Sequence, residues 1–385
     1  MIESSWAYVA LLLVCAGLFP FLEKNRQWRV FAVLPPIVMT YLLVTGLSVA
    51  GLWQSGETIE QSRKLILSWI LPALMFLLLV NCDIKAILAL GPRILLAFLC
   101  ATGSILLAML VVFMIMRGFL PAHADDTLAS VAGGWIGGTA NMIAVSQALS
   151  ANPDAVANAL LTDALCYSVW VLILFSSVPL QARFNRWVRV TAISERMTPS
   201  EIPVTANGLD TGTVLLWLGL GLLVGKAANG LAAWMPESDV LSASSWTLLL
   251  ATGFGLLASL TPLRRIAGSM PVSSALLAVV VAALASGATF AGLSSAPLFI
   301  LSGFMVLTLH GLLMVLAARV LRFDLALCGI ASLANVGGVA SAPLLAAAYS
   351  PLLAPLGVLL AMLGYLLGTG GGLLLASVFR AITPS

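Results

Sequence analysis

Charged residues are scarce in this sequence. Only 9% of its 385 residues are Asp, Glu, Lys or Arg, whereas soluble domains average about 25%. Hydrophobic residues make up 61% of the chain, and the mean hydropathy is +1.08. This composition excludes ordinary soluble enzyme folds, and a net charge of +3 is too small for a nucleic-acid-binding surface. We therefore expect a protein whose solvent is the lipid bilayer, with no nucleic-acid partner.

Histidine and cysteine are also few. The two histidines, His123 and His310, lie far apart, and the five cysteines form no CxxC pair. These absences argue against a zinc centre and against a disulfide framework. The HExxH motif of zinc proteases is absent, and His310 has no GxSxG-type element nearby. We expect no enzymatic activity, and an intramembrane hydrolase is retained only as the last alternative.

Long apolar runs dominate what is present. A helix needs about 20 apolar residues to cross the hydrocarbon core of a bilayer. Runs of this kind lie at 5–22, 30–52, 65–82, 93–116 and 154–178 in the first half, and at 211–234, 241–261, 271–292, 295–318 and 353–378 in the second. The sequence therefore predicts ten membrane-crossing helices.

Two further apolar stretches, 127–149 and 326–349, are crowded with Gly, Ala, Ser, Thr and Asn. Each contains a glycine pair, Gly137–Gly138 in the first and Gly337–Gly338 in the second. Glycine weakens a helix by about 1 kcal/mol relative to alanine, and Pro343 in the second stretch removes a backbone donor. We predict that both segments are broken or re-entrant.

The chain divides into two similar halves. A polar stretch, residues 181–210, separates residues 1–180 from residues 211–385 and reads as a linker. A shift of 200 residues superposes the two glycine pairs and places the broken segments at the same point in the order of spans. Paired broken helices at equivalent positions are typical of transporter binding sites.

The positive charges indicate that the second half is inverted. If both broken segments re-enter and the amino terminus is outside, most of the 18 basic residues, including those of the linker, fall on the cytoplasmic side. Five spans per half then place the second half in the opposite orientation. We predict an all-α polytopic membrane protein of two inverted repeats, each with five spans plus one broken or re-entrant segment. Both termini would lie outside a bacterial inner (plasma) membrane.

Asp163 is the acidic residue that the sequence places near the middle of an expected span, 154–178. A charge at the bilayer centre costs about 2.5–3.5 kcal/mol on insertion scales, so such residues usually face a cavity. We predict that Asp163 binds a coupling cation together with Thr162 and Asn158, with sodium preferred over a proton. The structural alternative is a protonated carboxyl hydrogen-bonded to a neighbouring helix.

The broken segments would form the solute site, because unwound helices expose carbonyl groups and helix N-termini. The candidate residues are Gly137, Gly138, Thr139, Asn141, Asn335, Gly337, Gly338 and Ser341. Close packing of small residues is the alternative for both segments. Packing is the preferred interpretation for His310 and for the GxxxG spacings of Gly364, Gly368 and Gly372.

The elements Gly133-Gly-Trp-Ile-Gly-Gly-Thr-Ala-Asn-Met142, Thr162-Asp163 and Ala334-Asn-Val-Gly-Gly338 resemble the YjcL-like family of bacterial multispan proteins, a family of unknown function. In a wider sense they are similar to sodium-coupled glutamate, citrate and bile-acid-type carriers. The resemblance implies an elevator-type homodimer, with a scaffold and a mobile core built around the broken segments. Leu363 stands 200 residues after Asp163, so the cation site would be asymmetric.

These patterns together predict a secondary active transporter. We expect symport of a small polar or anionic organic solute with sodium, or with a proton instead. The first alternative is a cation/proton antiporter that carries no organic solute.

Overall fold

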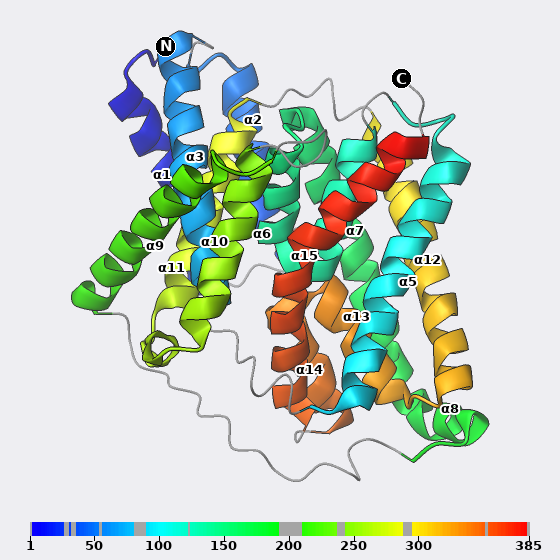
Figure 1. Ribbon diagram of the computed structural model, residues 1–385. Helices are drawn as coiled ribbons and strands as arrows, with labels where there is room; N and C mark the ends of the chain where they lie inside the picture. The colour runs from blue at the N-terminus through cyan, green and yellow to red at the C-terminus, as the bar shows by residue number, and fades with distance from the viewer. Residues whose placement is uncertain are drawn as a thin grey trace.

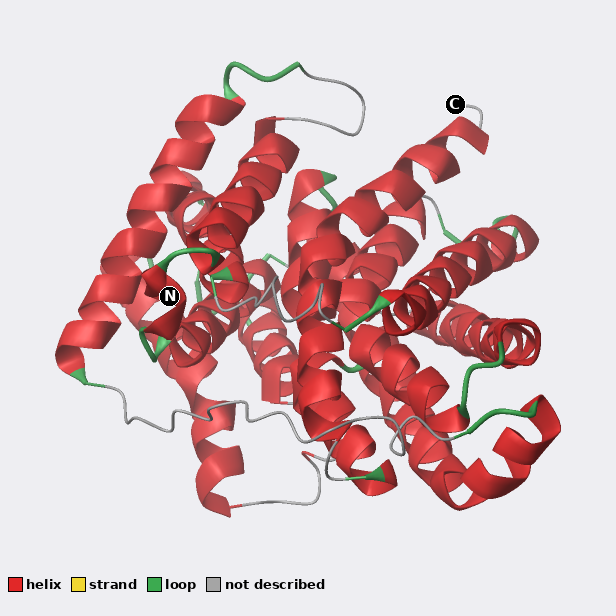
Figure 2. Ribbon diagram, turned by 60° about the horizontal axis from the view of Figure 1, so that its bottom comes forward, coloured by secondary structure: helices red, strands yellow, loops and turns green. Residues whose placement is uncertain are grey.

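The computed structural model describes residues 2–26, 31, 36–53, 56–80, 90–121, 124–191, 210–236, 243–287, 295–350 and 353–382. This part of the chain is helical throughout (Figure 2), apart from short turns and one isolated bridge between Ile2 and Trp53. The first half forms α1 (Ser5–Arg26), α2 (Pro36–Val49), α3 (Glu57–Leu79), α5 (Pro92–Met116), α6 (Ala124–Ala148), α7 (Pro153–Ser177) and the short α8 (Gln181–Val188). The second half forms α9 (Thr211–Ala232), α10 (Ala243–Ser259), α11 (Ser269–Ala285), α12 (Ala296–Leu321), α13 (Leu325–Val336), α14 (Gly338–Tyr349) and α15 (Ala354–Ile382).

Eight helices in the described part of the chain are long and apolar enough to cross a membrane. They begin at Ser5, Glu57, Pro92, Ala124, Pro153, Thr211, Ala296 and Ala354. Three expected spans, 30–52, 241–261 and 271–292, contain shorter helices of 14, 17 and 17 residues. Proline contributes to two of these limits, because Pro36 begins α2 and Pro262 follows the end of α10. Seven of the ten expected spans therefore contain a long apolar helix within the described residues, and the eighth such helix, α6, covers the expected broken segment 127–149.

The helices form two groups (Figure 1). The first group contains α1, α2, α3, α9, α10 and α11, and the second contains α5, α6, α7, α12, α13, α14 and α15. Contacts within each group are far more extensive than contacts between them. Each group combines helices from both halves of the chain, so packing does not follow the boundary at 181–210. Within that expected linker, α8 is a helix, and residues 192–209 lie outside the described residues.

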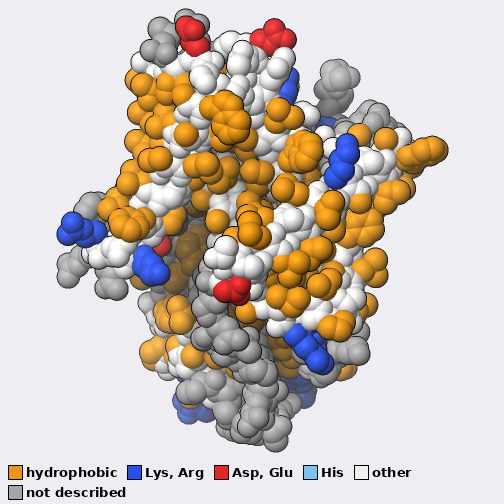
Figure 3. Space-filling view, turned by 90° about the vertical axis from the view of Figure 1, so that its left-hand side faces the viewer, with side chains coloured by type: hydrophobic (Ala, Val, Ile, Leu, Met, Phe, Trp, Pro, Cys, Tyr) orange, Lys and Arg blue, Asp and Glu red, His pale blue; other side chains and the backbone are white. Residues whose placement is uncertain are grey.

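The outer surface suits a hydrocarbon environment. Apolar side chains are spread over much of the upper part of the face shown in Figure 3, and few charged side chains lie among them. Leu13 of α1, Leu223 of α9 and Leu257 of α10 are among the exposed apolar residues. In water such a surface would be an aggregation hazard, whereas in lipid it is the ordinary exterior.

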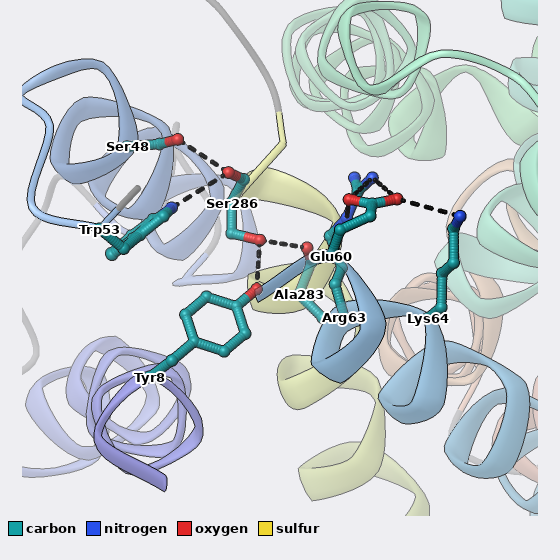
Figure 4. Close-up of polar contacts among 8 residues, drawn as sticks. All are labelled: Tyr8, Ser48, Trp53, Glu60, Arg63, Lys64, Ala283 and Ser286. Carbon is teal, nitrogen blue, oxygen red and sulfur yellow. Dashed lines mark hydrogen bonds and ion pairs between the residues drawn. The ribbon is translucent and has the colours of Figure 1, made fainter. Parts of the chain in front are cut away.

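Side chains from neighbouring segments complete the C-terminal end of α11 (Figure 4). The Ser286 carbonyl accepts hydrogen bonds from Ser48 Oγ at 2.7 Å and Trp53 Nε1 at 3.4 Å, and Ser286 Oγ lies 2.6 Å from Tyr8 Oη. The last carbonyls of a helix lack partners within it, and these contacts supply them. They fix α1, α2 and α11 to one another as a single unit.

Candidate functional site

The first glycine-rich segment is a helical hairpin. The backbone of α6 leaves helical geometry at Gly138, where φ is 78° and ψ is 172°. Ser146 Oγ lies 2.8 Å from Ser130 Oγ, although residues 16 apart in a straight helix would be about 24 Å apart. The two halves of α6 therefore fold back on each other, and we call residues 124–148 hairpin 1.

The second glycine-rich segment has the same form. α13 ends at Val336, and α14 begins at Gly338, which has a φ of 64°. A Cβ placed on Gly329 would lie 3.4 Å from Tyr349 Oη, so residues 20 apart in sequence are in contact. We call residues 325–349 hairpin 2. Both predicted breaks therefore occur at the glycine pairs.

The long helix α15 packs against both hairpins. Its GxxxG glycines face hairpin 1, and a Cβ on Gly368 would lie 2.7 Å from Gly137 Cα, which confirms the predicted close packing. Near the far end of α15, Arg380 Nη2 lies 3.1 Å from Asp126 Oδ1 at the start of hairpin 1. Hairpin 2 instead ends at Tyr349, just before α15 begins. The hairpins therefore approach from opposite ends of α15 (Figure 1).

The tips of the two hairpins meet at Tyr365 of α15. A Cβ on Gly138 would lie 3.2 Å from Tyr365 Cε1, and one on Gly338 would lie 4.0 Å from Tyr365 Oη. Both tips border a cavity of about 600 Å³ between the two helix groups. The first group contributes apolar side chains and hydroxyls to it, including Leu74, Leu78, Ser273 and Ser274. The unwound part of each hairpin is thus in contact with an internal space.

Asp163 lies on the wall of this cavity. Its Oδ1 accepts a hydrogen bond of 2.9 Å from Trp135 Nε1 of hairpin 1. Among the acidic residues of the described ranges, Asp163 alone lies near the middle of a long helix. A carboxylate here is surrounded by protein instead of lipid, which is the usual setting for an acid at membrane depth.

Five of the predicted site residues line the cavity: Gly138, Thr139, Gly337, Gly338 and Asp163. Asn141 and Asn335 are fully buried behind the tips. Asn141 Oδ1 accepts hydrogen bonds from Thr369 N at 2.9 Å and Thr369 Oγ1 at 2.5 Å, and Asn335 Oδ1 accepts one of 2.8 Å from Thr102 Oγ1. Each asparagine therefore ties its hairpin to a neighbouring helix.

The remaining predicted ligands surround the site without lining the cavity. Gly137 packs against Asn141 and α15, and Ser341 is buried beside Gly337 at the start of α14. Asn158 Nδ2 donates a 3.2 Å hydrogen bond to Ser295 Oγ. Thr162 is fully buried, and its Oγ1 has no hydrogen-bond partner among the described residues. Thr162 packs toward α12, where a Cβ on Gly303 would lie 2.8 Å from Thr162 Cγ2.

The described residues contain no cluster of three or more His, Cys, Asp or Glu side chains that could hold a metal. A cation at Asp163 would therefore depend on one carboxylate together with hydroxyl and backbone oxygens. Hard cations such as sodium accept oxygen ligands of this kind. Unwound helix ends supply such carbonyls in membrane carriers.

His310 has a packing role in this structure. Its Nδ1 lies 2.7 Å from Ser104 Oγ and its Nε2 lies 2.8 Å from Ser332 Oγ, which also accepts a hydrogen bond from Trp170 Nε1. Both ring nitrogens are satisfied, so the prediction of a satisfied packing residue is confirmed. The network links α5, α7, α12 and hairpin 2.

Three aromatic residues of the site had no signal in the sequence. Trp135 donates to Asp163, and Tyr167 and Tyr365 line the cavity. Aromatic residues in apolar helices also serve as core and as interface anchors. Their role becomes visible only through contacts with the hairpin tips.

The architecture defines a multi-pass membrane protein in which two helical hairpins meet at an internal cavity bordered by a carboxylate. The chain belongs to the family described as "Protein of unknown function (DUF819)", which it matches over residues 10–382. No curated protein matches the sequence.

Proposed function

We propose that the protein is a cation-coupled secondary transporter that works by alternating access. The observation that carries the proposal is the position of Asp163, on a cavity that both broken hairpins border and that separates two groups of helices. Discontinuous helices at the midplane are the usual means by which secondary transporters bind solutes and ions. A plain channel has no need of such paired hairpins.

The two hairpins support an inverted repeat. Their breaks are 200 residues apart in sequence, and they approach α15 from opposite ends. In this proposal the group with α1 and α9 is the scaffold, and the group with both hairpins moves as the core of an elevator. The assembly would be a homodimer in a bacterial inner membrane, with both termini outside.

In this proposal the cavity is accessible from one end of the bundle. It is bordered by the end of α1, the start of α2, the end of α3 and the start of α11, which follows Arg264 and Arg265. At the other end the groups are joined by hydrogen bonds from Tyr41 Oη to Pro153 O at 2.5 Å and from Ser245 Oγ to Ala148 O at 3.4 Å. Because Arg264 and Arg265 lie at this end, the positive-inside rule supports a cytoplasmic opening in this proposal.

Sodium is the preferred coupling ion, bound by Asp163 with oxygen from Thr162 and the hairpin tips. We expect sodium chloride to raise the melting temperature of the purified protein above its value in potassium chloride at equal ionic strength. Asp163→Asn should abolish this difference, because the amide cannot neutralise the ion. The control is Glu57→Gln in the exposed first turn of α3, which should keep it. A sodium effect that survives in Asp163→Asn contradicts the ion site.

The second candidate is a cation/proton antiporter. The single carboxylate on the cavity favours it, since one acid can exchange a proton for a metal cation. Proton flux measured in proteoliposomes that contain no organic solute distinguishes the antiporter from a solute-coupled transporter. A sodium gradient that drives proton flux there identifies the antiporter, and its absence favours coupling to a solute.

A further inference from the structure

We propose that the cargo is an organic cation, a protonated or quaternary amine with an apolar body, and that it exchanges with the coupling ion at Asp163. The inference rests on the proposed transport function and concerns the chemistry of the same cavity. It replaces the expected polar or anionic solute with a positively charged one.

In the described part of the cavity wall, both charged side chains are acidic. Among the described lining residues these are Asp163, deep in the cavity, and Glu23, near the end of α1 at its opening. An anionic solute would approach the Asp163 carboxylate in a space of low dielectric constant, where like charges repel strongly, whereas Glu23 is exposed at the opening. A cation instead replaces part of its lost hydration with the Asp163 carboxylate.

The helix ends at the hairpin tips do not reverse the negative electrostatic potential that Asp163 gives the cavity. At hairpin 1 one helical half ends at Gly137 and the next begins after Gly138, and at hairpin 2 α13 ends at Val336 where α14 begins at Gly338. Each tip therefore presents a negative C-terminus beside a positive N-terminus, each equivalent to about half a charge. The two contributions largely cancel, and the full charge of Asp163 determines the potential.

Aromatic rings complete a site for an amine. Tyr167 lies four residues after Asp163 in α7, so both side chains share one face of that helix, and both line the cavity. A Cβ on Gly337 would lie 2.8 Å from Tyr167 Cε2, and one on Gly338 would lie 4.0 Å from Tyr365 Oη, so the two side chains approach adjacent residues of one tip. Aromatic faces attract cations by about 0.5–2 kcal/mol. Across the cavity, Val38, Leu74 and Leu277 offer an apolar wall.

A shared carboxylate makes the two cations alternatives. If an amine occupies Asp163, sodium or a proton has to leave it, so each binds to the form of the carrier that the other has vacated. This coupling produces exchange across the membrane. Binding of the amine should then weaken as the concentration of the coupling ion rises.

The test uses three compounds with one skeleton: phenethylamine, 2-phenylethanol and 3-phenylpropionate. Their binding to the full chain in nanodiscs is measured by titration calorimetry at fixed ionic strength. We expect phenethylamine to bind at least tenfold more tightly than the other two. Asp163→Asn should lower its affinity by tenfold or more, Asp163→Glu should retain most of it, and Glu57→Gln should leave it unchanged. Replacing potassium by sodium should weaken it.

Three results would overturn the proposal. They are tighter binding of 3-phenylpropionate, no detectable binding of phenethylamine at millimolar concentration, and amine affinity unchanged in a folded Asp163→Asn protein. Tighter amine binding in sodium would overturn exchange. Transport is scored separately: sodium-driven uptake of a carboxylate in proteoliposomes refutes the amine and supports the proposed function. Amine binding without any flux supports the amine site and refutes the proposed transport function.

Discussion

Gly138 has a backbone conformation that is essentially reserved for glycine. With φ 78° and ψ 172° it lies in a region that costs other residues about 1–3 kcal/mol, and a Cβ there would lie 3.2 Å from Tyr365 Cε1. We expect Gly138→Ala to lower the free energy of unfolding by about 1–3 kcal/mol, measured by denaturation in detergent.

The matched control is Gly103→Ala. Gly103 lies within α5, and no atom would be within 4 Å of its added Cβ. Alanine favours a helix over glycine by up to about 1 kcal/mol, so this variant should be neutral or more stable. Equal losses in the two variants would show that Gly138 has no special role at the turn.

Residue types show which parts of the site can be predicted from sequence. Asp163 and the two glycine pairs are detectable because each is unusual in an apolar segment. Asn141 and Asn335 are equally unusual, but their hydrogen-bond partners Thr369 and Thr102 lie 228 and 233 residues away. No local pattern could show that these side chains hold the hairpins instead of facing the cavity.

Among the elements, α15 has one side with no room for an added side chain and another side with room for one. A Cβ on Gly368 would lie 2.7 Å from Gly137 Cα and 2.8 Å from Gly133 O, whereas one on Gly370 would meet nothing within 4 Å. We expect Gly368→Ala to lower the free energy of unfolding by about 1–3 kcal/mol, the usual cost of overpacking. Gly370→Ala in the same helix should cost nothing, and thermal denaturation of both proteins measures the difference.

The hairpins show how much of an element's course can be predicted from sequence. Glycine content was enough to predict two breaks, because the helical preference of Gly is low. Whether each segment crosses or turns back depends on tertiary contacts such as Ser130 with Ser146. Those contacts join residues that no period in the sequence relates.

For the whole molecule, access to the cavity from one end is directly testable. Ser274 lines the cavity near the start of α11, and Ser244 is exposed near the start of α10 at the other end. In a protein without native cysteines, a membrane-impermeant thiol reagent should label Ser274→Cys from the cytoplasmic side of vesicles. Ser244→Cys should be labelled from the opposite side. Labelling of Ser274→Cys from the outside alone would contradict the inward-open assignment.

The hydrogen bonds of Tyr41 with Pro153 and of Ser245 with Ala148 have an energetic consequence. A typical hydrogen bond contributes about 0.5–1.5 kcal/mol net, so two of them change a conformational equilibrium by roughly 5- to 150-fold. A single bound ion can supply a difference of that size. A ligand that favours one conformation by that amount would therefore set the resting population of this protein.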